Sequence, residues 1–283
     1  MVAVTGATGH LGRLVIAALL KKVPASGIIA LVRNVEKARD LAGLGVQVRL
    51  ADYNQPSMWD DALKGADKVL LISSSEVGQR AKQHRSVIDA AERAGVKLVA
   101  YTSVLRADTS PLGLAVEHKE TEALIRASGI PFALLRNSWY TENYTAGISN
   151  ALARGAVYGC AGEGRIAAAA RADYAEAAAV VMTAENQAGR VYELAGDTAF
   201  TLAELAAEIS RRSGKTIGYV DLSEAEYKNV LVKAGLPGPV AALYADSDTG
   251  ISKGALFDDG HQLSKIIDRP TTSLATAIAA AMK

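Results

Sequence analysis

The feature that most constrains the fold is a regular alternation of short apolar runs with amphipathic stretches over residues 1–136. Runs such as Ala30-Leu31-Val32 and Val69-Leu70-Leu71-Ile72 are typical of strands buried on both faces of a parallel sheet. The predicted strands are Val2–Thr5, Ile28–Val32, Val46–Leu50, Lys68–Ile72, Lys97–Thr102 and Phe132–Arg136. The predicted helices between them are Leu11–Lys21, Val35–Leu41, Ser57–Leu63, Arg80–Arg93 and Ala115–Ala127. This alternation predicts right-handed βαβ units and hence an α/β fold with a doubly wound parallel sheet.

A glycine-rich turn follows the first predicted strand and opens the first predicted helix. Gly6 permits a tight turn, Gly9 lets backbone N–H groups approach a pyrophosphate, and Gly12 allows close packing of helix on strand. The phosphates would then lie at the positive end of that helix. The pattern in this context predicts a dinucleotide site on a Rossmann-type domain. The expected contacts come from the whole turn, Gly6, Ala7, Thr8, Gly9, His10, Leu11 and Gly12.

The chain after Asn137 is less regular, and its predicted elements are mostly helices. They lie at Tyr174–Thr183, Leu202–Ser213, Glu224–Ala234, Val240–Ala245 and Ser273–Met282, with edge strands at Val191–Leu194 and Ile217–Val220. Thr201 with Glu204, and Ser223 with Glu226, have the spacing of capping boxes. We therefore expect a Rossmann domain at residues 1–136. A smaller, mostly helical part at 137–283 is expected to pack on it, share some sheet strands and cover the substrate.

The residues after the second predicted strand indicate which nicotinamide cofactor binds. NAD-specific folds usually place an acid there for the ribose 2′-hydroxyl, whereas this strand ends in Arg33. Its guanidinium suits a 2′-phosphate, with Lys37 as a second cation, although both are alternatively solvated surface charges. Asp52, after the third strand, is a candidate for the adenine amino group or for a helix cap. The pattern favours NADPH, with NADH as a weaker cofactor.

These residues resemble the NmrA-like branch of the atypical short-chain dehydrogenases. The resemblance rests on the glycine turn, on Val32-Arg33-Asn34, and on Leu134-Leu135-Arg136-Asn137 followed by an aromatic-rich segment. Within that branch the chain is most similar to members that reduce quinones and triphenylmethane dyes. Leu71–Arg80 and Arg136–Tyr144 carry this closer similarity, which covers essentially the whole chain. It implies NADPH-dependent reduction of a small-molecule quinone by two-electron hydride transfer.

The resemblance also implies where the nicotinamide half of the cofactor binds. Ser73, Ser74 and Ser75 would end the fourth strand beside the nicotinamide ribose, unless they only form local backbone hydrogen bonds. The residues that would line the nicotinamide and acceptor cleft are Asn137, Ser138, Trp139, Tyr140, Thr141 and Glu142. Ligands of open α/β sheets do bind beyond the carboxyl ends of the strands, so the sheet pattern points to the same edge.

The Tyr-x-x-x-Lys pair of most short-chain dehydrogenases is absent. The helix expected to carry it reads Leu114-Ala115-Val116-Glu117-His118-Lys119-Glu120 and has no tyrosine. The resemblance implies that His118 takes the position of a lysine used by related reductases. His118 then either donates a proton to a developing anion or is a structural histidine on an amphipathic helix. Lys119 is rotated about 100° from His118 on a helix and is expected at the surface.

A quinone acceptor does not need a dedicated acid, because water can protonate the hydroquinone anion. The protein must instead stack the acceptor and exclude water. Trp139, Tyr140 and Tyr144 are candidates for a flat apolar wall, with ordinary core packing as the alternative. Asn137 and Asn143 are candidates to orient the carboxamide or an acceptor oxygen. The candidate catalytic residues are thus His118, Asn137 and Tyr140.

Composition excludes several other classes. Net charge is +1 and no long block of one sign occurs, so we expect no nucleic-acid partner. Cys160 is the only cysteine and the four histidines are scattered, which predicts no disulfide and no metal site. No apolar run reaches membrane-spanning length, and we expect a cytoplasmic protein, with a homodimer allowed. Two alternatives stay open: a reductase of a triphenylmethane-type dye, or a non-catalytic dinucleotide sensor.

Overall fold

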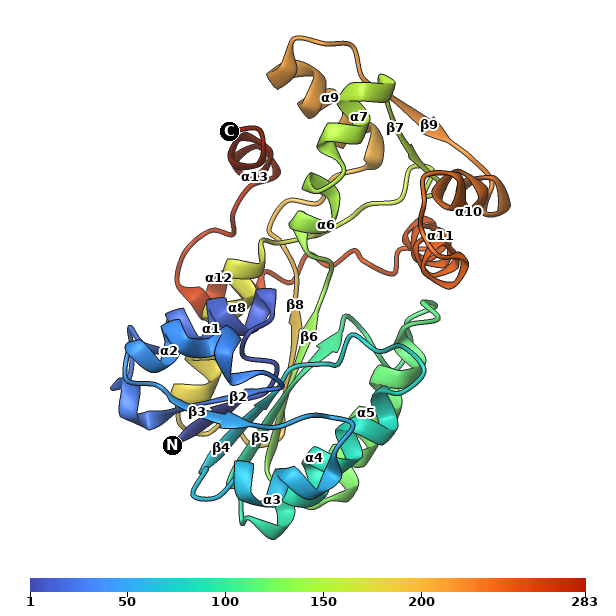
Figure 1. Cartoon of the computed structure of the whole chain (residues 1–283). Coiled ribbons are helices and arrows are strands. Elements are labelled where there is room, and N and C mark those ends of the chain that lie inside the picture. The colour runs from blue at the N-terminus through green and yellow to red at the C-terminus, as the bar shows by residue number, and fades with distance from the viewer. The chain divides into compact units, whose positions relative to one another are not determined.

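The computed structural model describes residues 1–283 and contains a seven-stranded parallel sheet (Figure 1). Its strand order is β3-β2-β1-β4-β5-β6-β8. The strands are β1 (Val2–Val4), β2 (Ile28–Val32), β3 (Gln47–Leu50), β4 (Lys68–Leu71), β5 (Leu98–Val104), β6 (Phe132–Asn137) and β8 (Arg190–Leu194). The order reverses at β1, which pairs with both β2 and β4, so that Ala3 lies opposite Ile29 and Val69. The predicted doubly wound parallel fold is therefore confirmed.

The chain forms two compact units. Unit 1 comprises residues 1–107, 117–137 and 171–192, and unit 2 comprises residues 108–116, 138–170 and 193–283. The predicted boundary after residue 136 lies one residue from a crossing between the units. Both units are assembled from separate segments of the chain, because residues 108–116 pack with unit 2 and residues 171–192 with unit 1.

Helices cover both faces of the large sheet. They are α1 (His10–Leu19), α2 (Arg39–Gly43), α3 (Trp59–Ala62), α4 (Arg80–Arg93), α5 (Ala115–Ala127) and α8 (Arg171–Thr183). Two predicted helices begin instead as 3₁₀ turns, at Val35–Ala38 and Pro56–Met58. The α1 helix packs against α8. Lys68 at the start of β4 donates to the carbonyl oxygens of Met182 and Ala184, which suits a cation at a helix C-terminus.

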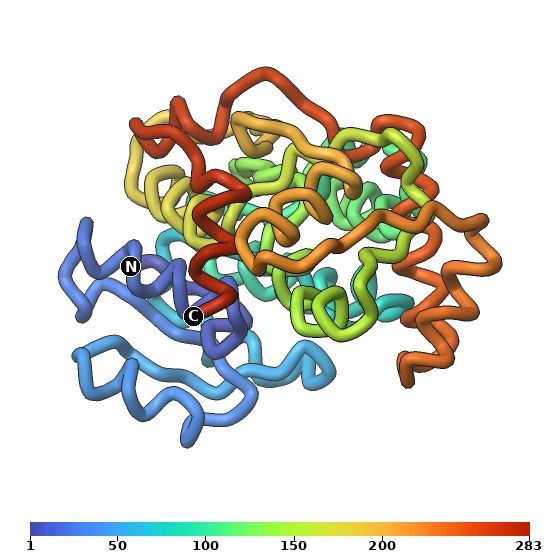
Figure 2. Tube along the Cα trace, turned by 90° about the horizontal axis from the view of Figure 1, so that it is seen from above, coloured from blue at the N-terminus to red at the C-terminus, as the bar shows by residue number.

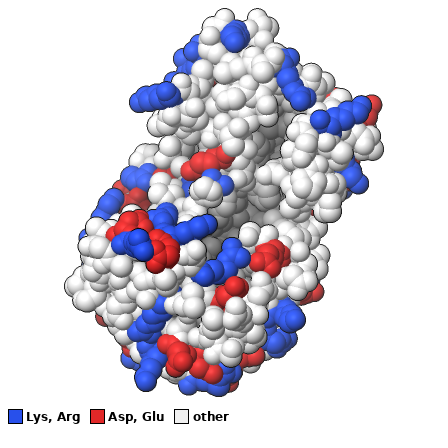
Figure 3. All heavy atoms as spheres, in the orientation of Figure 1, with Lys and Arg blue, Asp and Glu red and all other residues white.

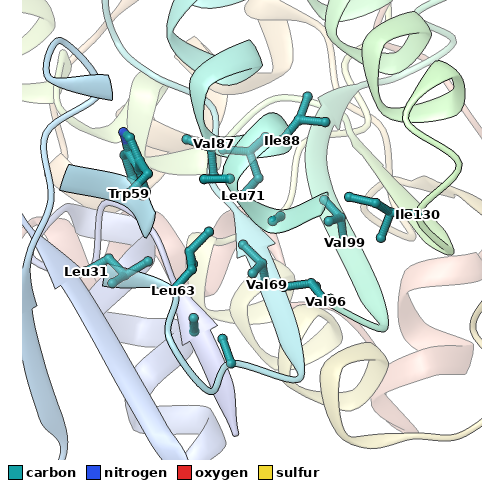
Figure 4. Packing of buried hydrophobic residues seen from close by; sticks show 14 of the residues in the cluster. Leu31, Trp59, Leu63, Val69, Leu71, Val87, Ile88, Val96, Val99 and Ile130 are labelled. Atoms are coloured by element: carbon teal, nitrogen blue, oxygen red, sulfur yellow. The ribbon is translucent and has the colours of Figure 1, made fainter. Parts of the chain in front are cut away.

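One core of unit 1 lies between the sheet and helices α3 and α4 (Figure 4). Trp59 and Leu63 come from the α3 region and Val87 and Ile88 from α4, and all are buried. They pack on side chains that alternate along the strands, among them Leu31, Val69, Leu71 and Val99. Fully burying each such side chain stabilises the fold by about 1.5–3 kcal/mol.

Unit 2 contains mostly helices. They are α6 (Thr141–Thr145), α7 (Ile148–Arg154), α9 (Leu202–Ser213), α10 (Glu224–Lys233), α11 (Gly238–Ser252), α12 (Gln262–Ile267) and α13 (Leu274–Ala281). The α10 and α11 helices lie side by side, as the orange and red-orange turns at the right of Figure 2 show. Both predicted capping boxes, at Thr201 and Ser223, are present.

A second, two-stranded parallel sheet pairs β7 (Ala156–Gly159) with β9 (Gly218–Asp221) in unit 2. The edge strand predicted at Val191–Leu194 is β8 of the large sheet, whereas the one predicted at Ile217–Val220 is β9 of this small sheet. The sequence analysis missed β7, α6, α7 and α12 and gave only part of α11. These elements are short or lack a clear period, so local pattern did not reveal them.

Candidate active site

The glycine-rich turn lies between β1 and α1, at the point where the strand order of the sheet reverses. Gly6 adopts a φ of 58°, in the region that favours glycine, and its carbonyl accepts from the Gly9 N–H at 2.8 Å. A Cβ at Gly12 would lie 2.3 Å from the Gly6 carbonyl oxygen. Gly12 is therefore required by the turn itself, and not only by helix–strand packing as predicted.

The other residues of the turn differ in exposure. His10 is exposed and Thr8 is half-buried, so their side chains are accessible to a ligand. Ala7 and Leu11 are buried, which leaves only their backbone groups for contact, and the Ala7 N–H already donates to the Leu31 carbonyl. The geometry thus offers the backbone of the turn and the N-terminus of α1 to an anion.

Arg33 follows β2 and carries an exposed guanidinium. Its side chain is 63% exposed, and Nη1 lies 3.5 Å from the Glu76 Oε1. Lys37 is exposed in the 3₁₀ turn after Asn34, whose Oδ1 accepts from the N–H groups of Glu36 and Lys37. Both cations are accessible, as binding a 2′-phosphate requires.

Asp52 forms a local turn in the loop that follows β3. Its Oδ1 accepts from the Asn54 N–H at 2.9 Å, and its carbonyl accepts from Trp59 Nε1 at 3.1 Å. The helical turns that follow have Gln55 and Met58 at their N-caps and no side-chain cap, so Asp52 caps neither of them, and its contact with the adenine amino group stays a prediction. The carboxylate that lies close to Arg33 belongs to Glu76, and the sequence analysis did not predict this contact. Glu76 accepts from Asn54 Nδ2 and Gln83 Nε2, so three separate segments meet there and no local pattern marks the cluster.

The serine loop, which we define as Ser73–Ser75, is held by side chains from other elements. The Ser73 N–H donates to Thr102 Oγ1 at 2.9 Å, and the Ser74 N–H donates to His84 Nε2 at 3.0 Å. Arg80 Nε donates to the Ser74 carbonyl at 2.7 Å. Ser75 is exposed, whereas the Ser73 hydroxyl is buried beside the Tyr101 side chain, with which it interacts.

The tautomer of His84 follows from its two partners. Nε2 accepts from a backbone N–H, so the proton lies on Nδ1, which is 2.9 Å from Thr121 Oγ1. Thr121 in turn donates to the Glu117 carbonyl. Burial, reinforced by the Arg80 charge, lowers the pKa of His84 to about 3. His84 is therefore a neutral support for the serine loop at physiological pH.

His118 lies on α5 in a buried pair with Tyr101 of β5. The His118 side chain is buried, and its Nδ1 lies 2.8 Å from the Tyr101 hydroxyl. Burial, with smaller contributions from Arg80 and His84, lowers the pKa of His118 to about 3. The imidazole is therefore neutral at physiological pH and already hydrogen-bonded to Tyr101, and its part in proton transfer stays a prediction. Lys119 is exposed, as expected.

The end of β6 is fixed by a buried ion pair that sequence reasoning missed. Arg136 meets Glu122 of α5 in a bidentate contact, with Nη2–Oε2 at 2.7 Å and Nε–Oε1 at 2.9 Å. Ser103 donates to the same carboxylate at 2.6 Å. The next residue, Asn137, is buried, and its Oδ1 has no hydrogen-bond partner. The end of β6 thus presents the Asn137 Oδ1 as a hydrogen-bond acceptor, which suits the N–H₂ group of a nicotinamide carboxamide.

Residues 138–142 belong to unit 2 and enter α6. The Ser138 hydroxyl donates to the Leu256 carbonyl, and the Thr141 N–H donates to the Ala169 carbonyl. Tyr140 forms a bridge with Ala169 just before α6, and Glu142 lies in the first turn of that helix. Of the predicted aromatic wall, Trp139 and Tyr144 line one cavity of about 200 Å³ within unit 2, together with Asn143, whereas Tyr140 is not part of its lining.

Other features of the chain concern membrane spans, metal sites and surface charge. None of its helices combines the length and the apolar character needed to cross a bilayer. No group of three or more His, Cys, Asp or Glu side chains is placed to hold a metal ion. On the face that Figure 3 shows, basic and acidic side chains are interspersed.

Comparison with known proteins defines the class. Residues 1–268 match the NmrA-like family, and the chain belongs to that family, as the sequence analysis predicted. It is 57% identical over 278 residues to quinone oxidoreductase 2 of Escherichia coli (strain K12), covering 98% of this chain and 97% of that protein.

Solved structures agree with this relationship. An NADPH complex of an NADPH-dependent quinone oxidoreductase from Escherichia coli has a TM-score of 0.98 and 56% identity, with 100% of both chains covered. The triphenylmethane reductase of Citrobacter sp. complexed with NADP(H) has a TM-score of 0.96 and 43% identity, over 99% of this chain and 100% of that one.

Proposed function

We propose that this protein is an NADPH-dependent quinone oxidoreductase that transfers a hydride from the nicotinamide to a bound quinone. The observation that carries the proposal is the 57% identity, over nearly the full length of both chains, to a protein named quinone oxidoreductase 2. The fold supplies the matching framework, since the carboxyl edge of its sheet carries the glycine turn, Arg33, the serine loop and Asn137.

We assign the cofactor contacts from the geometry of unit 1. The turn from Gly6 to Gly12 would hold the pyrophosphate, and Arg33, with Lys37 beside it, would bind the 2′-phosphate. Two buried polar atoms, Ser73 Oγ and Asn137 Oδ1, would meet the ribose and the carboxamide. NADPH, when bound, supplies the hydride. NADH lacks the 2′-phosphate and would bind more weakly.

We assign the acceptor-binding site to residues 138–144. We propose that His118 does not transfer a proton to the acceptor. Trp139 and Tyr144 offer aromatic surface to a planar ring, and Asn143 lies beside them on the same cavity wall. His118 is neutral, buried and hydrogen-bonded to Tyr101, so water is the source of the one proton that completes the hydroquinone after hydride transfer. Tyr140 remains a candidate for orienting the acceptor from the start of α6.

We further propose that the protein works in the cytoplasm, which the single free cysteine, Cys160, supports. In functional terms, residues 1–136 supply most of the dinucleotide site and residues 137–283 most of the acceptor site. The homodimer and the absence of a nucleic-acid partner both stay predictions. Sedimentation of the purified protein tests the homodimer.

The decisive experiment follows NADPH oxidation by the purified protein, through the nicotinamide absorbance, with and without a small benzoquinone. We expect quinone-dependent turnover well above the uncatalysed rate. Asn137→Ala should lower kcat strongly, while Lys119→Ala, an exposed substitution on α5, should leave it unchanged. Tight NADPH binding without turnover on quinones would overturn the proposal and favour a dinucleotide sensor.

A second candidate is the reduction of a triphenylmethane dye. The observation that favours it is the TM-score of 0.96 and 43% identity to triphenylmethane reductase. The same assay with a panel of quinones and cationic dyes separates the two activities, because the preferred acceptor has the higher kcat/KM.

A further inference from the structure

Unit 2 contains a cavity of about 200 Å³, partly open to its surroundings, that the proposed hydride transfer does not by itself require. Apolar side chains of α9 and α10 form much of its wall, including Leu202, Leu205, Ile209, Val230 and Leu231. Residues from α7, β7 and α11 complete it. Ligand sites in proteins are clefts with mostly apolar walls, so this cavity is a candidate binding site.

Its size and chemistry define what can fill it. An apolar cavity of about 150 Å³ is known to stay dry and to bind benzene, so this one accommodates a group of roughly six to eight carbon atoms. Asp248 is the only acid in the lining, and Arg154 the only lysine or arginine. Asp248 is buried and accepts from the Cys160 N–H at 3.0 Å, so it is tied to the backbone beside β7. Most of the remaining wall is apolar but is interrupted by polar groups such as Asn150, Tyr158 and Ser247, so it suits an uncharged ligand that is largely hydrocarbon.

The cavity begins at the segment that we assign to the acceptor. Trp139, Asn143 and Tyr144 all line it, and Trp139 follows Asn137 by only two residues. A planar ring held by this segment therefore has an apolar chamber next to it in the same unit. No charged group of the cofactor is expected in such a chamber, because burying charge without a partner is costly.

We propose that this cavity binds the apolar substituent of the quinone, so that the preferred substrates are quinones with a short alkyl or prenyl chain. This inference rests on the proposed function. The chain would extend past Trp139 between α9 and α10, and its length would be limited to roughly eight carbon atoms by the volume of the cavity. Longer chains gain no further burial.

The test measures kcat/KM for benzoquinones with linear alkyl chains of increasing length. Burial of each methylene is worth about 0.8 kcal/mol, so we expect kcat/KM to rise about twofold to fourfold per methylene, mainly through KM, and to level off near eight carbons. Equal values for all chain lengths would overturn the inference while leaving the proposed function intact. No turnover with any quinone would instead remove the proposed function.

A matched pair of variants on α10 localises the effect. Val230→Phe narrows the cavity and should lower kcat/KM for the hexyl quinone at least tenfold more than for bare benzoquinone. Val232→Phe makes the same change at an exposed position outside the lining and should keep the parent ratio. If both variants, or neither, change the ratio, the chain does not lie in this cavity. Leu205→Ala enlarges it and should move the plateau to longer chains.

A binding measurement without turnover separates the ligand from the reaction. Trp139 lines the cavity and Trp59 is the only other tryptophan, so the fluorescence lost in Trp139→Phe reports this site. Hexylphenol, which accepts no hydride, should quench that signal, and Val230→Phe should abolish the quenching. Quenching by a cationic dye but not by hexylphenol would show that Asp248 and the aromatic groups select a cation, and would overturn the inference.

Discussion

The glycine turn after β1 and the serine loop after β4 end neighbouring strands of one sheet, yet they are held in different ways. The glycine turn is specified by its own backbone, through the φ of Gly6 and the close approach of Gly12 to the Gly6 carbonyl. The serine loop is held from outside, by Thr102, Arg80 and His84.

This difference explains which half of the cofactor site a sequence reveals. A turn that only glycine can form leaves a local signature that is readable from a few residues. A loop held by distant side chains leaves none, because its anchors are spread over β5 and α4 and are themselves buried. Substitutions in the glycine turn should therefore act through backbone shape, and substitutions around the serine loop through the loss of side-chain support.

The largest effect is expected at Gly12. A Cβ there would lie 2.3 Å from the Gly6 carbonyl oxygen and 2.8 Å from the Ala7 Cα, and neither backbone atom can move without distorting the turn. Gly12→Ala should weaken NADPH binding more than about 100-fold and destabilise the fold by about 3 kcal/mol, as overpacking does. Isothermal titration and thermal unfolding measure the two effects.

Gly43→Ala is the matched control, because a Cβ at Gly43 meets nothing within 4 Å. We expect that variant to bind NADPH as the parent does, with stability unchanged or slightly raised by the better helix propensity of alanine. A Gly12→Ala variant that binds NADPH normally would show that the turn is not specified by its backbone.

The next effect is expected at His84, which supports the serine loop. His84→Ala leaves the buried Ser74 N–H without its acceptor, which costs about 1–3 kcal/mol and should raise the KM for NADPH about tenfold to 100-fold. His84→Gln should recover part of the loss, because its Oε1 can replace Nε2 as acceptor, whereas His84→Asn should not. An equal increase in the KM for NADPH in His84→Ala and His84→Gln would mean that His84 acts by packing and not through this hydrogen bond.

Much of unit 1 could be predicted because its strands are continuous apolar runs, such as Val69–Leu71, and its first turn carries three glycines. Unit 2 was less predictable, because its elements are short and β7 pairs with β9 across more than fifty residues of chain. The serine loop itself was expected from a family resemblance, but the Ser74–His84 and Arg136–Glu122 contacts were not. The backbone bridge of Tyr140 to Ala169 was not predicted either, and the place of Tyr140 in the aromatic wall stays a prediction.

A smaller and more selective effect is expected at Arg33. This residue is part of neither the glycine turn nor the contacts that hold the serine loop. Its guanidinium is 63% exposed, so water screens its contact with a 2′-phosphate. Arg33→Ala should raise the KM for NADPH about tenfold and leave that for NADH nearly unchanged. Arg39→Ala removes another exposed guanidinium nearby in sequence and should change neither. Equal effects of Arg33→Ala on both cofactors would remove Arg33 from the 2′-phosphate site.

The smallest effect on turnover is expected at His118, although its protonation should affect stability. Burial holds the pKa of His118 at about 3, so the imidazole stays neutral from pH 8 to pH 5 and the kcat profile should show no inflection near 6.5. An inflection there that disappears in His118→Gln would instead identify a catalytic acid.

The stability of the fold should nevertheless depend on His118 in the same pH range. In the unfolded chain this histidine titrates near 6.5, whereas in the folded protein it resists protonation down to about 3. Its contribution is therefore complete above pH 6.5 and is lost as the pH falls. Between pH 6 and pH 5 the parent should lose about 1.4 kcal/mol per pH unit more than His118→Gln does. Burial raises the pKa of Asp248 to about 6, so Asp248 changes stability with pH in the opposite direction. Its contribution is the same in the parent and in His118→Gln, and it cancels when the two proteins are compared. Urea unfolding of both proteins across this range measures it, and parallel curves would mean that His118 is charged in the folded protein.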